Sequence, residues 1–470
     1  MHAINELARF VSNFPAEEVL AAGRERISML VLDLLGAAAA GIDTPLAKAA
    51  RTAALESYGQ GEIDIWLTSM RTSVVGGAMA NSAAASALDI DDGHRGAGGH
   101  PGAGIIPAAL AVAQAVGASG SELMSAIALG YEVGLRVASC RPLQTIEMHA
   151  SGRWVNFGVA AAASRLLGLN ADQTAHALAI AGCEGPVIFL NASSKFDGTS
   201  IKEGIPPAVV AGITAAYRAQ ACATGPIELL DDDARYTRSS LIGNLGSSWE
   251  VQNCYIKPYA CCRYIHGAID AILSIRKSSH PVFKLRIETF PHAMRLANER
   301  APRTLEGGQY SFYFNCAVAA LYGPTALQPV QPEHFRDSQV LELAARIELE
   351  ASLEFANAFP ALTPARVILD QGYGPEEMVV LHPLGDTANP LSSKQIEEKF
   401  RHISRDCIGP QWQDEIVTAV SNLHNAGSTA LFAALVPPHK RYSEPASELV
   451  VVPSERLMFV QEKPSEAEFG

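Results

Sequence analysis

Aromatic residues and long apolar runs are both scarce in this chain of 470 residues. Only 7% of the residues are aromatic, although 48% are hydrophobic, so small and aliphatic side chains supply most of the apolar surface. No run approaches the roughly 18 to 20 consecutive apolar residues that span a bilayer. The opening residues lack the basic segment and apolar core of a secretory signal. We therefore expect no membrane association, a cytoplasmic location, and close-packed helices rather than a β-sandwich.

Positive charge is also in deficit. The formal net charge is −13 with an isoelectric point near 5.5, and the sequence contains no basic cluster. We therefore expect no nucleic-acid partner. An acidic protein can still bind an anionic substrate, provided that Lys, Arg and His gather locally at the site.

The common signatures of metal and cofactor sites are missing as well. The eight cysteines include no C-x-x-C pair, and the adjacent Cys261 and Cys262 suit neither an ordinary disulfide nor a tetrahedral zinc site. No P-loop, H-E-x-x-H or strand-to-helix G-x-G-x-x-G motif occurs. We expect reduced thiols, with Cys261 and Cys262 as packing residues, and we expect no bound metal and no cofactor.

The hydrophobic periodicity predicts a mainly α protein. Residues 1–265 are predicted to form a helical domain, 266–390 a smaller α+β domain, 391–435 helices that return to the first domain, and 436–470 a C-terminal extension. Alternation of apolar and polar residues predicts strands in the smaller domain. The expected helices are 4–41, 46–57, 74–89, 107–116, 121–139 (capped by Ser121), 154–167, 172–181, 206–219, 310–321, 393–403 and 414–435; the expected strands are 284–290, 345–355, 365–369 and 377–382.

One loop concentrates the polar chemistry. After an Ala-rich helix, the stretch 83–104 carries acids, imidazoles and a guanidinium among several glycines, so we expect the helix to end near Asp92. Polar groups on a flexible loop between apolar helices are typical of a functional site. A capped, solvated helix connection is the alternative. The polar residues are Asp89, Asp91, Asp92, His94, Arg95 and His100.

Three further stretches place titratable groups beside small residues. His149 precedes an Ala-rich helix, where a helix cap is the alternative role. Lys202 lies just before the helix expected from Pro206, a position where the helix dipole disfavours a cation unless an anion is near. The stretch 257–266 holds Lys257, Arg263 and His266 at the predicted domain junction, where pockets commonly form.

Together these groups suit proton abstraction beside a carboxylate. Lys202, Lys257 and Arg263 would bind the carboxylate and stabilise the enediolate-like charge that develops on it. A histidine and the acids near Asp89 would exchange the proton. Asp33, isolated in an apolar helix, is expected instead to be a paired structural carboxylate.

At these same stretches the sequence resembles the MmgE/PrpD family over residues 5–435. The marks are LDLLGAAAAG at 32–41, NSAAASALDIDD with GHPGAGIIPAALAVA at 81–113, HASGRWVNFGVAAAASRLLGLNADQTAHALAIAG at 149–182 and KPYACCRYIHGAIDA at 257–271. The resemblance implies a large all-helical domain formed by both chain ends, a smaller α+β lid domain and a homodimer. It also implies a small anionic polycarboxylate substrate, handled without an organic cofactor.

Matched motif by motif, the resemblance implies that Asp89, His100, His149, Lys257 and Lys202 are catalytic. At Lys202 the spacing to the following glycine is one residue short of the family pattern. The residues expected to bind substrate are Asp92, His94, Arg95, Arg263, His266 and Tyr310, the last either as a pocket hydroxyl or as a core residue.

Two departures from the family pattern guide the choice of reaction. Gly93 and His94 follow Asp92 where dehydratases have a hydroxyl residue, and Cys262 stands where the decarboxylase has a histidine. We therefore expect epimerisation of an iminodisuccinate-like amino dicarboxylate. The alternative is a hydro-lyase of the 2-methylcitrate dehydratase type or a decarboxylase of the cis-aconitate type, and a non-catalytic scaffold is a third possibility.

Overall fold

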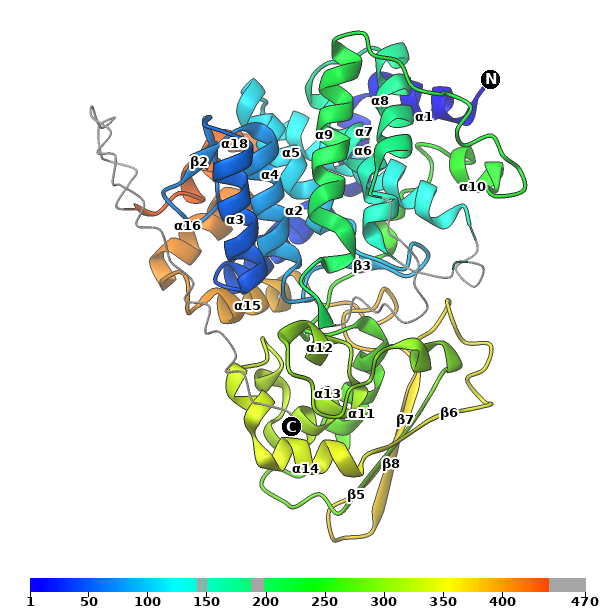
Figure 1. The fold of residues 1–470 in the computed structure, drawn as a ribbon, viewed down its shortest axis with the longest axis vertical. Helices are drawn as coiled ribbons and strands as arrows, with labels where there is room; N and C mark the ends of the chain where they lie inside the picture. The colour runs from blue at the N-terminus through cyan, green and yellow to red at the C-terminus, as the bar shows by residue number, and fades with distance from the viewer. Residues whose placement is uncertain (142–145, 147–149, 187–197, 439–470) are drawn as a thin grey trace, which may run out of the picture.

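The chain forms a large helical domain and a smaller α+β domain, which lie one above the other in Figure 1. The computed structural model describes residues 1–141, 146, 150–186 and 198–438. The predicted fold class is confirmed: the protein is mainly helical, with a small mixed sheet in its C-terminal half. The extension beyond 438 and His149 lie outside the described residues.

The large domain is built from helices of both chain ends. Its first core cluster contains residues from Ala3 to Ile256 and again from Leu391 to Leu435. Its helices are α1 (Ala3–Asn13), α2 (Ala16–Gly41), α3 (Pro45–Ser57), α4 (Val74–Ser86), α5 (Gly102–Val116), α6 (Gly120–Ser139), α7 (Val155–Leu166), α8 (Ala171–Glu184), α9 (Ile205–Gln220), α10 (Arg238–Ile242), α15 (Ser393–Ser404), α16 (Pro410–Ser421), α17 (Leu423–Ala426) and α18 (Ser428–Ala434). Three short strands accompany them: β1 (Ile63–Asp64), β2 (Arg71–Thr72) and β3 (Gly93–His94), the last paired with β4 (Cys254–Tyr255).

Small residues allow the central helices to approach closely. A Cβ on Gly130 of α6 would lie 2.8 Å from the carbonyl oxygen of Gly158 on α7. Nearly every residue of α5 and α7 is buried, as expected of helices in the interior of a large domain. The abundance of Ala and Gly therefore reflects tight helix packing.

The C-terminal helices are joined to the first by a buried ion pair. Lys399 of α15 contacts Asp33 of α2 at 2.5 Å and donates to the carbonyl of Ile90 at 2.8 Å. The expected structural role of Asp33 is thereby confirmed. The contact with Ile90 also ties α15 to the loop that follows α4.

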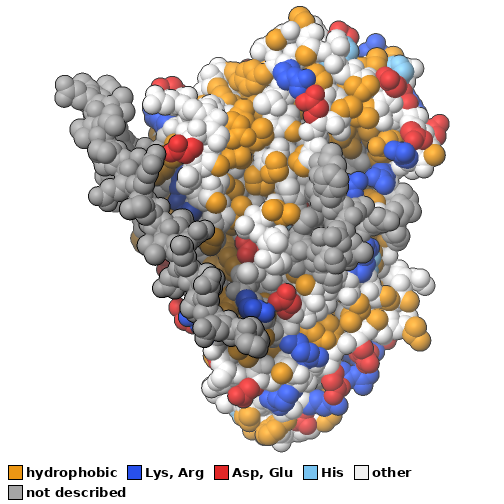
Figure 2. All heavy atoms as spheres, viewed as in Figure 1, with side chains coloured by type: hydrophobic (Ala, Val, Ile, Leu, Met, Phe, Trp, Pro, Cys, Tyr) orange, Lys and Arg blue, Asp and Glu red, His pale blue; other side chains and the backbone are white. Residues whose placement is uncertain are grey.

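The smaller domain contains a four-stranded sheet in the order β6-β5-β7-β8, in which only β5 and β6 are parallel. A separate core cluster between Tyr259 and Leu369 fills this domain. Acidic and basic side chains are interspersed over its surface (Figure 2), and Arg366 pairs with Glu288 and Glu377 across three strands. Its elements are α11 (His266–Ile275), β5 (Lys284–Thr289), α12 (Leu305–Gln309), α13 (Phe312–Tyr322), α14 (Ser338–Arg346), β6 (Glu348–Ala351), β7 (Ala365–Asp370) and β8 (Pro375–Val380).

Several predicted boundaries were wrong for local reasons. The helix expected over 4–41 is broken at Pro15, which cannot donate a backbone hydrogen bond. The helix before the polar loop ends at Ser86 rather than near Asp92, and in the turn that follows it Asp89 adopts a left-handed φ of 56°. The cap of α6 is Ser119, which forms a reciprocal capping box with Glu122.

Two further expected elements are shorter than predicted. The strand over 345–355 is reduced to β6, and the helix over 414–435 is divided into α16, α17 and α18.

Among the described helices, none alone has the length and apolarity to cross a bilayer, whereas the bent pair Gly23–Gly41 and Pro45–Ser57 meets both conditions together.

Candidate active site

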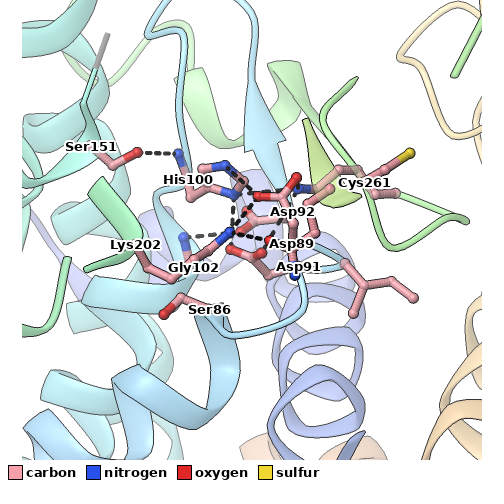
Figure 3. A network of polar contacts seen from close by, with 12 residues as sticks. Ser86, Asp89, Asp91, Asp92, His100, Gly102, Ser151, Lys202 and Cys261 are labelled. Carbon is pink, nitrogen blue, oxygen red and sulfur yellow. Dashed lines mark hydrogen bonds and ion pairs between the residues drawn. The ribbon is translucent and has the colours of Figure 1, made fainter. Parts of the chain in front are cut away.

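Three segments far apart in the sequence bring charged side chains together. Asp89 and Asp91 lie in the loop after α4, and His100 lies just before α5. Lys202 opens the short 3-10 helix η4 (Lys202–Gly204), and Lys257 follows β4. Figure 3 shows the carboxylates of this loop converging with His100 and Lys202. All five side chains are buried.

Asp89 is the centre of the cluster. Its Oδ1 accepts a hydrogen bond from Lys202 Nζ at 2.8 Å and lies 3.5 Å from His100 Nε2. Its Oδ2 lies 3.3 Å from Lys257 Nζ. Burial alone would raise the pKa of this carboxyl, but the charges of Lys202, Lys257 and His100 lower it well below its usual range. Asp89 is therefore a carboxylate over the working pH range.

His100 is oriented by Asp91, a residue that the sequence prediction left out of the site. The Nδ1 of His100 lies 3.0 Å from Asp91 Oδ2. Burial lowers the pKa of the imidazole and Lys257 opposes its charge, yet Asp91 and Asp89 together raise it above its ordinary value. Because a carboxylate at Nδ1 fixes the orientation of the ring, Nε2 points towards Asp89.

The cluster also includes a residue of the smaller domain. Gln309, at the end of α12, accepts from Lys202 Nζ at 3.1 Å and donates to the carbonyl of Ala87 at 2.9 Å. Tyr310 presents its ring 5.5 Å from the same ammonium group. Lys202 therefore lies where the two domains meet, as does the loop that carries Asp89.

Asp92 lies in the same loop but bonds to other groups. It accepts hydrogen bonds from the Tyr131 hydroxyl and from the amide of Gly102, both at 3.0 Å. Burial, followed by the charge of Asp91, raises its pKa to about 7. Its carboxyl group thus changes charge near neutrality.

We expect Asp92 to make the fold less stable as the pH rises from 6 to 8. Since the unfolded chain is already ionised in this range, losing the folded-state proton costs about 1.4 kcal/mol, the value of one pH unit of linkage. In Asp92→Asn this loss should disappear, because the amide carries no proton to release. Denaturant unfolding of both proteins at pH 6 and pH 8 measures the difference. Equal pH dependence in the two proteins would show that Asp92 is ionised throughout.

Three residues predicted to bind substrate contact protein groups in the structure: Arg263, Arg95 and His266. Arg263 is buried, donates to the carbonyls of Pro383 and Leu384, and contacts Asp386. Arg95 contacts the other oxygen of Asp386 at 3.3 Å. The Nε2 of His266 bonds to the carbonyl of Cys261, and burial beside Arg263 holds the pKa of His266 well below its usual range.

His94 has a partner of its own. Its Nε2 lies 3.2 Å from Glu250, and its Nδ1 accepts from the amide of Ala97. A Cβ on the preceding Gly93 would lie 2.4 Å from the Tyr255 hydroxyl, so packing against Tyr255 requires a glycine there. The glycine at position 93 therefore has a structural role within the β3–β4 pair.

Sequence reasoning missed Asp91, Ser151, Glu203 and Gln309 at the site. Asp91 was recognisable as part of the acidic run before the loop glycines, whereas nothing local distinguishes Ser151, Glu203 or Gln309.

Within the described ranges, no group of three or more His, Cys, Asp or Glu residues has the arrangement of a metal site. The cluster instead mixes lysines with carboxylates.

Comparison with known proteins identifies the relationship. The model of the MmgE/PrpD N-terminal domain matches residues 5–244, and that of the C-terminal domain matches residues 259–425. The chain belongs to the MmgE/PrpD family. The family membership that the resemblance implied is thus confirmed, and the protein is an enzyme of that family.

The curated relatives of this MmgE/PrpD enzyme share about a quarter of its residues. They include the cis-aconitate decarboxylase-like protein oryM of Aspergillus oryzae, 23% identical over 92% of this chain and 96% of the relative. A cis-aconitate decarboxylase of Aspergillus terreus is 24% identical over 89% of this chain and 92% of the relative. The cis-aconitate decarboxylase of Homo sapiens is 25% identical over 90% of this chain and 92% of the relative. These relatives favour a lyase over the epimerase that we expected.

Proposed function

We propose that this enzyme is a lyase acting on a small di- or tricarboxylate, with decarboxylation of cis-aconitate or a close analogue as its reaction. The observation that carries the proposal is the buried cluster in which Lys202, Lys257 and His100 surround Asp89. The names of the relatives, spread over nearly the full chain, support the same reaction class.

The cluster offers what such a reaction needs. When the carbon–carbon bond to the leaving carboxylate breaks, its electron pair stays on the substrate carbon and spreads into a neighbouring carboxylate. Lysine ammonium groups in a buried site stabilise that developing charge. A general acid must then deliver a proton to the carbon, and His100, whose raised pKa favours the imidazolium, is suited to do so. Carbon dioxide leaves, and an unsaturated acid with one carboxylate fewer remains.

The experiment is turnover of cis-aconitate in deuterium oxide. We expect release of carbon dioxide in step with an unsaturated product that carries one solvent deuterium per molecule. Release of water from 2-methylcitrate or a related hydroxy acid, without carbon dioxide, would replace this proposal with a hydro-lyase. If neither acid is consumed, the decarboxylase proposal fails.

Epimerisation of an iminodisuccinate-like substrate is the second candidate, favoured by the cysteine at position 262 where the decarboxylase has a histidine. It requires only proton exchange, so single-enantiomer substrate in deuterium oxide should gain deuterium and lose optical rotation with no carbon dioxide released. The glycine at position 93 also has a structural role, because its packing against Tyr255 leaves no room for a side chain. A homodimer stays a prediction, which the solution mass would test.

A further inference from the structure

Glu203 occupies an unusual stretch of backbone beside the candidate site. Lys202 and Glu203 have φ values of 38° and 56°, and Gly204 follows at 72°. Residues other than glycine seldom adopt this left-handed conformation, and two in succession require support from their surroundings. The consequence is that Lys202 points at Asp89, while the half-buried Glu203 lies beside the Nε2 of His100.

The support comes from the segment around Ser151. The backbone N–H and the hydroxyl of Ser151 both donate to Glu203 Oε2, at 2.9 and 2.6 Å. A Cβ on Gly152 would lie 2.5 Å from the carbonyl oxygen of Gly204, so the two segments are in direct contact. The carboxylate of Glu203 thus holds the η4 turn against the short helix η2 (Ser151–Arg153).

The same serine reaches His100. Its Oγ accepts a hydrogen bond from the backbone N–H of His100 at 2.9 Å, as Figure 3 shows. Glu203 Oε1 lies 3.9 Å from His100 Nε2, on the side of the ring where Asp89 lies at 3.5 Å. Glu203 therefore acts on His100 twice, through Ser151 on its backbone and through space on its ring.

We propose that Glu203 is a positioning residue for His100, acting through Ser151 to fix the backbone and directly to steady the Nε2 of the ring. The inference rests on the proposed function in one respect, namely that His100 is the group that transfers the proton. The charged groups facing His100 are Asp91 at Nδ1, Asp89 and Glu203 at Nε2, and Lys257 beside Nδ1. Among these carboxylates, Glu203 is the one that also bonds to the serine holding the histidine.

Kinetics in two backgrounds test this positioning role. We expect Glu203→Gln and Ser151→Ala each to lower kcat by about 10-fold with KM within about twofold, the usual scale for a residue that orients a reactive group. The kcat of the double variant should be at most about threefold below that of the less active single variant, because the two residues act on His100 through the same hydrogen bonds. In a His100→Asn background, Glu203→Gln should have no further effect. A loss that persists undiminished without the histidine would overturn the proposal.

A measurement without substrate separates this inference from the proposed reaction. The ring signal of His100, assigned as the one missing from His100→Asn, can be titrated by NMR in protein with labelled histidine. Removing the charge of Glu203 should lower the titration midpoint of His100, since an opposite charge 3.9 Å from Nε2 favours the imidazolium. The matched control is Glu184→Gln, an exposed glutamate paired with Arg218, which should leave the midpoint unchanged.

The kinetic and NMR experiments can fail independently of each other. If no carboxylate is turned over but the His100 midpoint falls in Glu203→Gln, the proposed reaction is wrong and the positioning role stands. If the midpoint is the same in Glu203→Gln and native protein, the positioning role is wrong whatever the substrate. Thermal unfolding of each variant identifies any loss that comes from the fold itself.

Discussion

Replacing His100 with asparagine should lower turnover by about 100-fold or more, the usual scale for losing a general acid or base. Asparagine keeps a polar group near Asp91 but cannot carry a proton at neutral pH. The effect should fall on kcat, because the change leaves Lys202 and Lys257, the proposed partners of the substrate carboxylates, in place. Steady-state rates with the carboxylate substrate measure it.

The matched control for that change is His176→Asn. His176 is a half-buried histidine on α8 that bonds to the backbone of Gly225, away from the cluster. Its replacement should leave turnover within about twofold of the native rate, because surface-type substitutions away from a site have small effects. A His100→Asn protein that keeps nearly the native rate would show that another group moves the proton.

The second large effect concerns stability. Asp89→Asn removes the carboxylate that two fully buried ammonium groups share, leaving Lys202 with Gln309 and Lys257 with Asp91 at 3.9 Å. Breaking a buried ion pair by removing one partner typically costs about 3–5 kcal/mol, because the remaining charge stays desolvated. We expect a loss of that size in the free energy of unfolding, measured by denaturant titration at pH 7.

Asp64→Asn is the control for this loss. Asp64 pairs with Arg71 at 2.8 Å, but the arginine side chain is 53% exposed. Water screens that pair, so its loss should cost only about 1 kcal/mol or less. Equal losses in the two variants would mean that the two lysines of the cluster do not depend on Asp89 for their stabilisation.

The helices and the polar segments were predictable from sequence because their causes are local. Apolar spacing predicted α3, α7, α9 and α15 to within two residues at each end. Where a boundary was wrong, a single residue overrode the pattern, as Pro15 did by lacking a backbone donor. Short segments with flanking turns, such as β6, were predicted less well since their length depends on the neighbouring strand.

The candidate site was predicted in part. Asp89, His100, Lys202 and Lys257 were all named, since each stands in a polar interruption of small-residue backbone, and the structure brings all four together. The assignment of Arg263 and His266 to substrate binding stays a prediction, because their contacts seen in the structure are with Asp386, Pro383, Leu384 and Cys261. Charge and residue type alone do not reveal whether a protein partner already occupies a side chain.

The sequence by itself determined the helical architecture, the position of the charged loop and the family, because periodicity and motifs are properties of neighbouring residues. Only the tertiary structure decided which charged side chains contact one another. Lys202 meets Asp89 across 113 positions and Lys399 meets Asp33 across 366, distances over which sequence spacing carries no contact information. Packing also shifted the pKa values of Asp89 and Asp92 in opposite directions, although the two residues are only three positions apart. The pKa of Asp89 is lowered because cations surround it, and that of Asp92 is raised because it is buried beside a carboxylate.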